Sequence, residues 1–175
     1  MVNQTACVIA PTVKVRRLLE GYQVNRPIHV IPTGIDLSRF CRPVDEIQLN
    51  VLRRSLGIPA EAFLMVYVGR LAEEKNISEL LHQTAALSDP SVRLLLVGDG
   101  PYRTSLESQV QALGLTEQVI FTGMIPPDQV ADYYRLGNVF VSASSSETQG
   151  LTYLEALSSG VPALCRRDEC LAGIT

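Results

Sequence analysis

Five short apolar runs alternate with four amphipathic segments between residues 63 and 165, and this order constrains the fold more than any other feature of the chain. The runs are almost continuously apolar, as in strands that helices cover on both faces; they span 63–69, 92–98, 119–123, 138–144 and 161–165. The segments between them carry apolar residues at helical spacing and span 77–87, 102–113, 128–136 and 151–159. This alternation predicts an α/β fold with a doubly wound, Rossmann-like parallel sheet.

The first part of the chain also alternates between strand and helix patterns, and a linker separates it from the rest. Strands are expected at 6–9 and 28–31, with a helix at 13–20 between them. The three cations of that helix, Lys14, Arg16 and Arg17, are expected to form a solvated face. Pro43 marks a linker, and a further helix is expected at 46–56, where Gly57 ends it.

Composition narrows the class of partner. The 175 residues have a formal net charge of −3, so the chain offers no basic field for a nucleic-acid backbone and we expect a small-molecule partner. The four cysteines, Cys7, Cys41, Cys165 and Cys170, lack paired spacing and are expected to be free thiols. The two histidines are far apart in the sequence, so we expect no metal site. No apolar run approaches the roughly 20 residues that span a bilayer.

Ligands of doubly wound sheets bind at the carboxyl ends of the strands, so the loops there are where chemistry is expected. The loop GRLAEEKN (69–76) carries Arg70 and Lys75 just before a helix, a combination suited to a diphosphate. The alternative is that these cations only pair with Glu73 and Glu74 on a solvated loop, and this loop alone leaves the two interpretations equally supported.

The next strand end, GDGP (98–101), resembles a dinucleotide fingerprint only superficially. Arg103 stands where the third glycine of GxGxxG belongs, and that glycine permits close helix–strand packing at a pyrophosphate. We therefore interpret this segment as a tight turn.

The segment SSSETQGLTYLEALSSGVP (144–162) contains Glu147 and Glu155, separated by seven residues, with Gly150 between them. The amides of Gly150, Leu151 and Thr152 would begin a helix, where the dipole favours phosphate. Carboxylates beside a phosphate would repel it, so both glutamates are expected to face hydroxyl groups of a sugar and a ribose. The alternative is that Glu155 lies on the helix surface and Glu147 is an ordinary loop acid.

Together these motifs resemble the donor-binding, C-terminal half of a GT-B retaining glycosyltransferase of family 4, also called glycosyltransferase group 1. VIPTGIDLSRF (30–40) is similar to that family's crossing between domains, and GRLAEEKN, LLLVGDGP, VIFTG and SETQGLTYLEALSSGVP follow in the family's order. The resemblance implies that residues 1–45 are the tail of an N-terminal acceptor domain with its linker. Residues 46–175 would then be a nucleotide-sugar-binding domain that is incomplete at its C-terminus.

The resemblance also implies roles for individual residues. Arg70 and Lys75, beside Gly69, would hold the diphosphate, and with Glu147 they are the expected catalytic residues. Glu147 would meet the transferred hexose and Glu155 the ribose, while the start of the helix would meet phosphate through three residues, Gly150, Leu151 and Thr152. The base would lie at Met124 and Ile125. No cofactor and no metal are required, since cations and the helix dipole would stabilise the leaving diphosphate.

The segment ETQGLTYLEAL is more similar to the family branch that glucosylates diacylglycerol. The resemblance therefore implies UDP-glucose as donor and a lipid such as diacylglycerol, or another glycan or lipid, as acceptor. It implies a cytoplasmic protein with peripheral contact at the inner face of the cell membrane, and a fragment that binds donor without transferring sugar. Two alternatives stay open: an enzyme like the nucleotide-sugar 2-epimerases, and a non-catalytic nucleotide-sugar-binding module.

Overall fold

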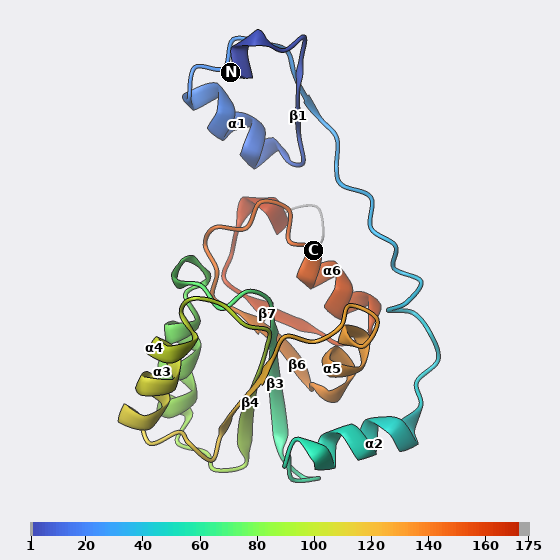
Figure 1. Cartoon of the computed structure of the whole chain (residues 1–175), viewed down its shortest axis with the longest axis vertical. Helices are drawn as coiled ribbons and strands as arrows, with labels where there is room; N and C mark the ends of the chain where they lie inside the picture. Colours follow the sequence, from blue (N-terminus) through green and yellow to red (C-terminus); the bar gives the residue numbers. More distant parts are fainter. Residues whose placement is uncertain (1, 172–175) are drawn as a thin grey trace.

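The computed structural model describes residues 2–171, which form a small N-terminal unit, an extended linker and a larger α/β unit (Figure 1). In the small unit, β1 (Val8–Ala10) and β2 (Ile28–Val30) pair in parallel, and α1 (Val13–Gly21) connects them. The predicted first strand lies two residues later than expected, because Thr5 and the residues before it form a short turn in which the Thr5 amide bonds to the Val2 carbonyl. Beyond the linker, α2 (Glu46–Ser55) begins where the Asp45 carboxylate accepts bonds from two backbone amides.

The larger unit is built on a five-stranded parallel sheet in the order β5-β4-β3-β6-β7. Its strands are β3 (Phe63–Val68), β4 (Val92–Val97), β5 (Val119–Gly123), β6 (Val139–Ser142) and β7 (Ala163–Cys165). The chain runs outward from β3 to β5, returns to the other side of β3 and continues outward through β6 and β7. The direction of winding therefore reverses between β3 and β6, and doubly wound sheets bind their ligands at such a switch point.

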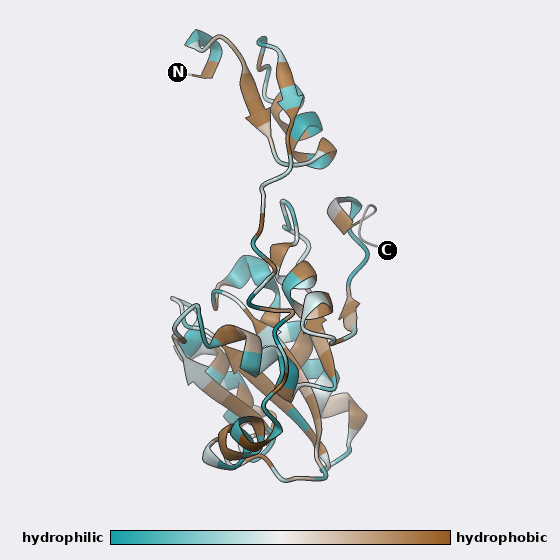
Figure 2. Cartoon of the chain, turned by 90° about the vertical axis from the view of Figure 1, so that its right-hand side faces the viewer, coloured by the Kyte–Doolittle hydropathy of each residue, from teal (hydrophilic) through white to brown (hydrophobic). Residues whose placement is uncertain are grey.

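Helices cover both faces of this sheet, as the near-continuous apolar strands predicted. The helices are α3 (Ile77–Leu87), α4 (Arg103–Ala112), α5 (Val130–Leu136) and α6 (Leu151–Ser158). On one face, α3 and α4 pack against side chains such as Leu94 and Leu96. On the other, α2, α5 and α6 pack against the alternate side chains, such as Leu64 and Leu95. Figure 2 shows hydrophobic residues along the strands of the sheet and a mixture of hydrophobic and hydrophilic residues along the helices.

The predicted doubly wound Rossmann-like fold is thus observed, and the differences lie at element ends. The helix expected from residue 128 begins at Val130, because the Gln129 amide bonds to the Pro126 carbonyl and residues 127–129 form a turn. Cys7, Cys41 and Cys165 are free, whereas the side chain of Cys170 and residues 172–175 of the predicted donor domain lie outside the described residues.

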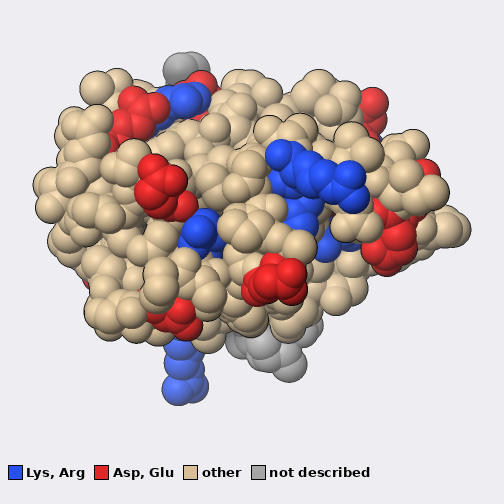
Figure 3. Space-filling model, turned by 90° about the horizontal axis from the view of Figure 1, so that it is seen from below, with Lys and Arg blue, Asp and Glu red and all other residues tan. Residues whose placement is uncertain are grey.

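The surface carries charges of both signs. On the face shown in Figure 3, basic and acidic side chains are interspersed, and the atoms described there form no broad basic area. Within residues 2–171, none of the helices has the length and apolar character needed to cross a bilayer.

Candidate functional site

Two cavities adjoin at the switch point of the sheet. The first, of about 450 Å³, is lined by Arg70, Lys75, Glu147 and the start of α6, and is called the Glu147 cavity below. The second, of about 460 Å³, is lined mainly by Met124, Ile125 and the glycine-rich turn after β4, and is called the Met124 cavity. Val68, Gly69 and Arg70 line both. The predicted phosphate, hexose and base residues are therefore brought to one continuous edge of the sheet.

Lys75 and Glu147 form an ion pair across the switch point. Lys75 lies in a short 3-10 turn (η2, Glu73–Lys75) after β3, whereas Glu147 lies in the loop after β6. The Lys75 Nζ donates to Glu147 Oε1 at 2.8 Å, and the two side chains are 24% and 13% exposed. A partly desolvated pair of this kind is rigid, so the ammonium and the carboxylate have fixed positions at the wall of the cavity.

Arg70 is a more exposed cation than Lys75. Its guanidinium pairs with Glu74, as the alternative interpretation of this loop expected, and its side chain is 63% exposed. Exposed pairs of this type contribute little stability. The guanidinium can therefore exchange Glu74 for an anionic ligand at small cost. Lys75 pairs with Glu147 instead of Glu73 or Glu74, so the alternative interpretation of this loop is wrong for Lys75.

The side chain of Tyr67 holds the loop that carries Arg70 through a hydrogen bond. The Tyr67 hydroxyl donates to the Arg70 carbonyl at 3.1 Å, and its side chain lines the Glu147 cavity. Burial raises the pKa of Tyr67 well above its ordinary value, and the nearby Glu147 carboxylate raises it further. This tyrosine therefore stays protonated and keeps donating. The apolar pattern of β3 marked Tyr67 only as a strand residue.

The start of α6 faces the Glu147 cavity. Gly150 precedes the helix with φ +70°, and a Cβ there would lie 2.8 Å from a Leu171 methyl carbon, so the position favours glycine. The amides of Leu151 and Thr152 have no acceptor among residues 2–171, and both residues line the cavity. These two donors lie where the sequence predicts an anion site, and the helix dipole there favours negative charge.

Glu155 lies deeper than Glu147 and lines neither cavity. Its Oε2 accepts a hydrogen bond of 2.9 Å from the hydroxyl of Tyr134, a side chain fully buried in the core. Burial raises the pKa of Glu155, and the bond from Tyr134 opposes that shift. The remaining oxygen, Oε1, accepts no bond from the described residues. The alternative interpretation, in which Glu155 lies on the helix surface, is therefore wrong, because half-burial against Tyr134 orients this side chain.

The segment GDGP forms a wall of the Met124 cavity, and the turn predicted there lies later, at 101–102, where the Arg103 amide donates to the Gly100 carbonyl at 3.1 Å. It packs directly on the loop after β3: a Cβ on Gly98 would lie 2.1 Å from the Gly69 carbonyl oxygen, and one on Gly100 would lie 2.3 Å from that of Leu71. The Leu71 amide donates to the Asp99 carbonyl at 2.9 Å, which closes the contact. Gly98 and Gly100 thus let the loop after β4 approach the loop after β3. The comparison with GxGxxG did not predict this role.

Met124 and Ile125 lie together in the second cavity, as expected. The Met124 side chain is 78% exposed, and Ile125 packs against the core below. A large exposed apolar side chain beside an apolar cavity suits the flat face of a base.

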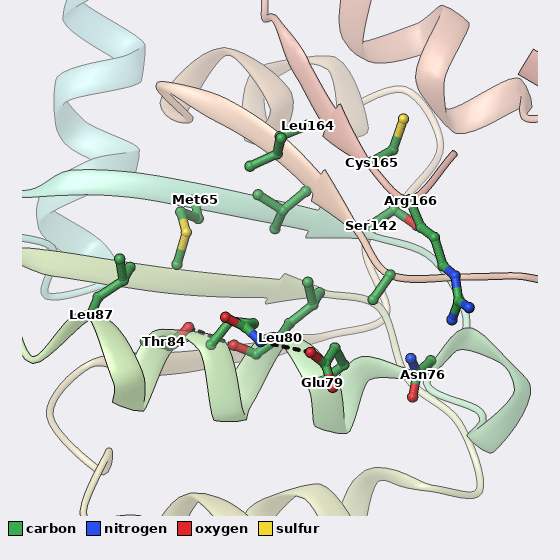
Figure 4. A pocket seen from close by; sticks show the side chains of 13 residues that line it. Met65, Asn76, Glu79, Leu80, Thr84, Leu87, Ser142, Leu164, Cys165 and Arg166 are labelled. Carbon is green, nitrogen blue, oxygen red and sulfur yellow. Dashed lines mark hydrogen bonds between the residues drawn. The ribbon is translucent and has the colours of Figure 1, made fainter. Parts of the chain in front are cut away.

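A third cavity, of about 630 Å³, lies on the α3 side of the sheet beside β6 and β7 (Figure 4). Apolar side chains such as Met65, Leu80 and Leu164 dominate it. Two of its polar side chains are already bonded along α3, since Thr84 donates to the Leu80 carbonyl at 2.7 Å and Gln83 donates to Glu79 at 2.7 Å. Its wall does not provide the paired charges of the Glu147 cavity. No group of three His, Cys, Asp or Glu side chains able to hold a metal ion occurs within residues 2–171.

Comparison with known proteins identifies a family for this chain. Residues 50–174 match the family described as Glycosyl transferases group 1. The alpha-monoglucosyldiacylglycerol synthase of Streptococcus pneumoniae is 45% identical over 160 residues, covering 90% of this chain and 36% of that protein. The protein of the same name from Acholeplasma laidlawii is 32% identical over 164 residues, covering 92% of this chain and 41% of that protein.

Solved structures share the architecture. HepE of Anabaena, in complex with UDP and glucose, superimposes with a TM-score of 0.85 at 23% identity, covering 98% of this chain and 47% of that chain. Sucrose-phosphate synthase from Thermosynechococcus elongatus gives a TM-score of 0.81 at 30% identity, covering 97% of this chain and 43% of that chain. This chain thus spans less than half the length of the proteins that it matches. The predicted resemblance is confirmed, and the chain belongs to the glycosyl transferases group 1 family.

Proposed function

We propose that this chain is the donor-binding part of a retaining glycosyltransferase that transfers glucose from UDP-glucose to a lipid acceptor such as diacylglycerol. Residues 46–175 would bind the donor, and residues 1–45 would be the tail and linker of an acceptor domain. The names of the two curated relatives support the glucose and the lipid. A contact with the cytoplasmic surface of a membrane follows from a lipid acceptor and is part of the proposal.

The observation that carries this proposal is the Lys75–Glu147 pair in the wall of a cavity that the start of α6 also lines. The amides of Leu151 and Thr152, together with Arg70 and Lys75, offer donors to a diphosphate. Glu147 offers carboxylate oxygens to hexose hydroxyls on the far side of Lys75. The UDP moiety would extend past Arg70 so that its base enters the Met124 cavity, and Glu155 Oε1 would meet the ribose.

The chemistry assigned to these residues is stabilisation of the leaving group. When the bond between the anomeric carbon and the β-phosphate oxygen breaks, its electron pair stays on that oxygen. Arg70, Lys75 and the α6 amides then face a more negative diphosphate than in the ground state, so their interaction strengthens as the reaction proceeds. Glu147 keeps the hexose in position while the acceptor approaches.

A binding panel tests the donor assignment directly. We expect UDP and UDP-glucose to raise the melting temperature of the 175-residue chain, and GDP, ADP and NAD to have smaller effects, because a ligand that binds only the folded state stabilises it. Stabilisation by NAD alone would exclude a nucleotide-sugar site. The full-length gene product, assayed with labelled UDP-glucose and diacylglycerol, separates a transferase from a binding module. Nuclear magnetic resonance of the product's anomeric proton checks retention.

A further inference from the structure

The loop that carries Glu147 is held by the N-terminal unit, from residues far away in the sequence. Thr12 Oγ1 donates to the Thr148 carbonyl at 2.8 Å, across 136 residues. Lys14 Nζ donates to the Glu147 carbonyl at 2.9 Å, across 133 residues. Gln149 Nε2 donates to the carbonyl of Thr33 at 3.2 Å. We call the N-terminal partners, Thr12, Lys14 and Thr33, the N-terminal clasp.

Lys14 is the charged member of this clasp and is fixed on two sides. Besides the Glu147 carbonyl, its ammonium contacts the Asp168 carboxylate, with Nζ 2.8 Å from Oδ1 and 2.5 Å from Oδ2. The Asp168 side chain is only 6% exposed, and that of Lys14 is 30% exposed. Charge-assisted bonds of this kind are short and roughly twice as strong as neutral ones. Lys14 therefore ties the Glu147 loop to the segment that follows β7.

The position of Thr12 makes this tie rigid. Thr12 is the N-cap of α1, where its side-chain oxygen accepts a bond from the Val15 amide. Lys14 lies in the first turn of the same helix, so the cap fixes the direction from which its side chain leaves the backbone. The helix start and the Glu147 loop thus have one relative position in which both bonds form.

Glu147 is consequently held at both ends. Lys75 of the larger unit binds its carboxylate, and Lys14 of the N-terminal unit binds its carbonyl. Lys14 does not line the Glu147 cavity, although Pro11 of the same unit and Thr33 of the linker do. Its effect on a ligand must therefore pass through Glu147 rather than through direct contact.

We propose that Lys14 is a positioning residue for Glu147, so that the N-terminal unit, when seated, completes the hexose-binding part of the donor site. This inference rests on the proposed function. It assigns a role in recognising the sugar to a residue outside the donor-binding unit. UDP lacks the hexose, so its binding does not need an oriented Glu147, whereas UDP-glucose binding does.

Calorimetric titration of the full 175-residue chain with UDP and with UDP-glucose tests this role. In Lys14→Met we expect UDP-glucose to bind about tenfold more weakly and UDP to bind within about twofold of the parent, as for one lost charge-assisted bond. Lys14→Arg, which keeps a cationic donor, should recover most of the UDP-glucose affinity. Arg16→Ala is the matched control, because Arg16 lies on the same helix and, among the described residues, pairs only with exposed Glu20; it should change neither affinity.

A change of both affinities by the same factor in Lys14→Met, or of neither, would overturn the positioning role. If Lys14→Met does not melt cooperatively, Lys14→Gln replaces it, and an unchanged preference for UDP-glucose over UDP in that variant overturns the role equally. Failure of the parent chain to bind either nucleotide would instead refute the proposed function, so the two failures are distinguishable.

Discussion

Replacing Lys75 by methionine should both destabilise the protein and weaken UDP binding. Methionine keeps most of the length of the side chain but leaves Glu147, which is 13% exposed, without its cation. Two unit charges at the 2.8 Å separation of this pair attract by roughly 6 kcal/mol at an effective dielectric constant of about 20. Desolvation and side-chain ordering offset most of that attraction.

We therefore expect Lys75→Met to lower the free energy of unfolding by about 2 kcal/mol. This value lies between those for exposed and for buried ion pairs, in keeping with the 24% exposure of the Lys75 side chain. For a chain of this size the melting temperature should fall by about 4–8 °C. UDP should bind at least about tenfold more weakly, because one charge-assisted bond to the diphosphate is lost.

Thermal melting and calorimetric titration measure the two effects separately, and the double variant Lys75→Met/Glu147→Gln is the control. It removes both charges, so stability should return to within about 1 kcal/mol of the parent while UDP binding stays weak. A melting temperature unchanged in Lys75→Met would refute the energetic argument for the pair. A UDP dissociation constant within twofold of the parent would refute the phosphate role of Lys75.

Three further predictions follow from the site. In the full-length enzyme, Arg70→Ala should raise the barrier by about 2–4 kcal/mol, and steady-state rates within twofold of the parent would contradict the assignment. Gly100→Ala should cost at least about 2 kcal/mol of stability in urea unfolding, because its Cβ would meet the Leu71 carbonyl oxygen at 2.3 Å; Gly21→Ala, where nothing lies within 4 Å, is the control. Burial raises the pKa of Glu155 above that of the unfolded chain, so the folded state binds more protons and stability falls as pH rises through the folded pKa. Glu155→Gln should remove this loss of stability. The variant should therefore exceed the parent in free energy of unfolding by more at neutral pH than below a pH of about 4.5, the ordinary pKa of the carboxyl group. A gain in the free energy of unfolding that does not depend on pH would show that burial of the charge is not its source.

The sequence predicted the sheet, its helices and the edge where the site lies, because these depend on local periodicity and on the rule that parallel strands align their carboxyl ends. Arg70, Lys75 and Glu147 could be placed near one another for the same reason. The pairing itself could not be predicted, since Lys75 had Glu73 and Glu74 as nearer candidates. Only the adjacency of β3 and β6 brings Glu147, 72 residues away, within reach of its ammonium.

The contacts that sequence reasoning missed have no local signal. Tyr134 has the appearance of an ordinary core aromatic in α5, and nothing near it in the sequence points to Glu155, 21 residues later. Lys14 was expected on a solvated face with Arg16 and Arg17, and that expectation is wrong for Lys14. Its partner Asp168 lies 154 residues away in the sequence. Lysine and aspartate side chains are usually exposed, so neither residue type indicated a contact between them.

The reversal of winding at β3 also affects the order in which the protein can acquire its ligand during folding. Strands β3, β4 and β5 pair with the strands next to them in the sequence and can assemble first, whereas β6 must cross back to pair with β3. Pairings that are distant in the sequence close large loops and form late. A chain that has assembled only its first three strands therefore has Lys75 but no Glu147 and no α6 amides beside it. Nucleotide binding should consequently report completion of the sheet, and a nucleotide added during refolding should capture only molecules in which β6 is already in place.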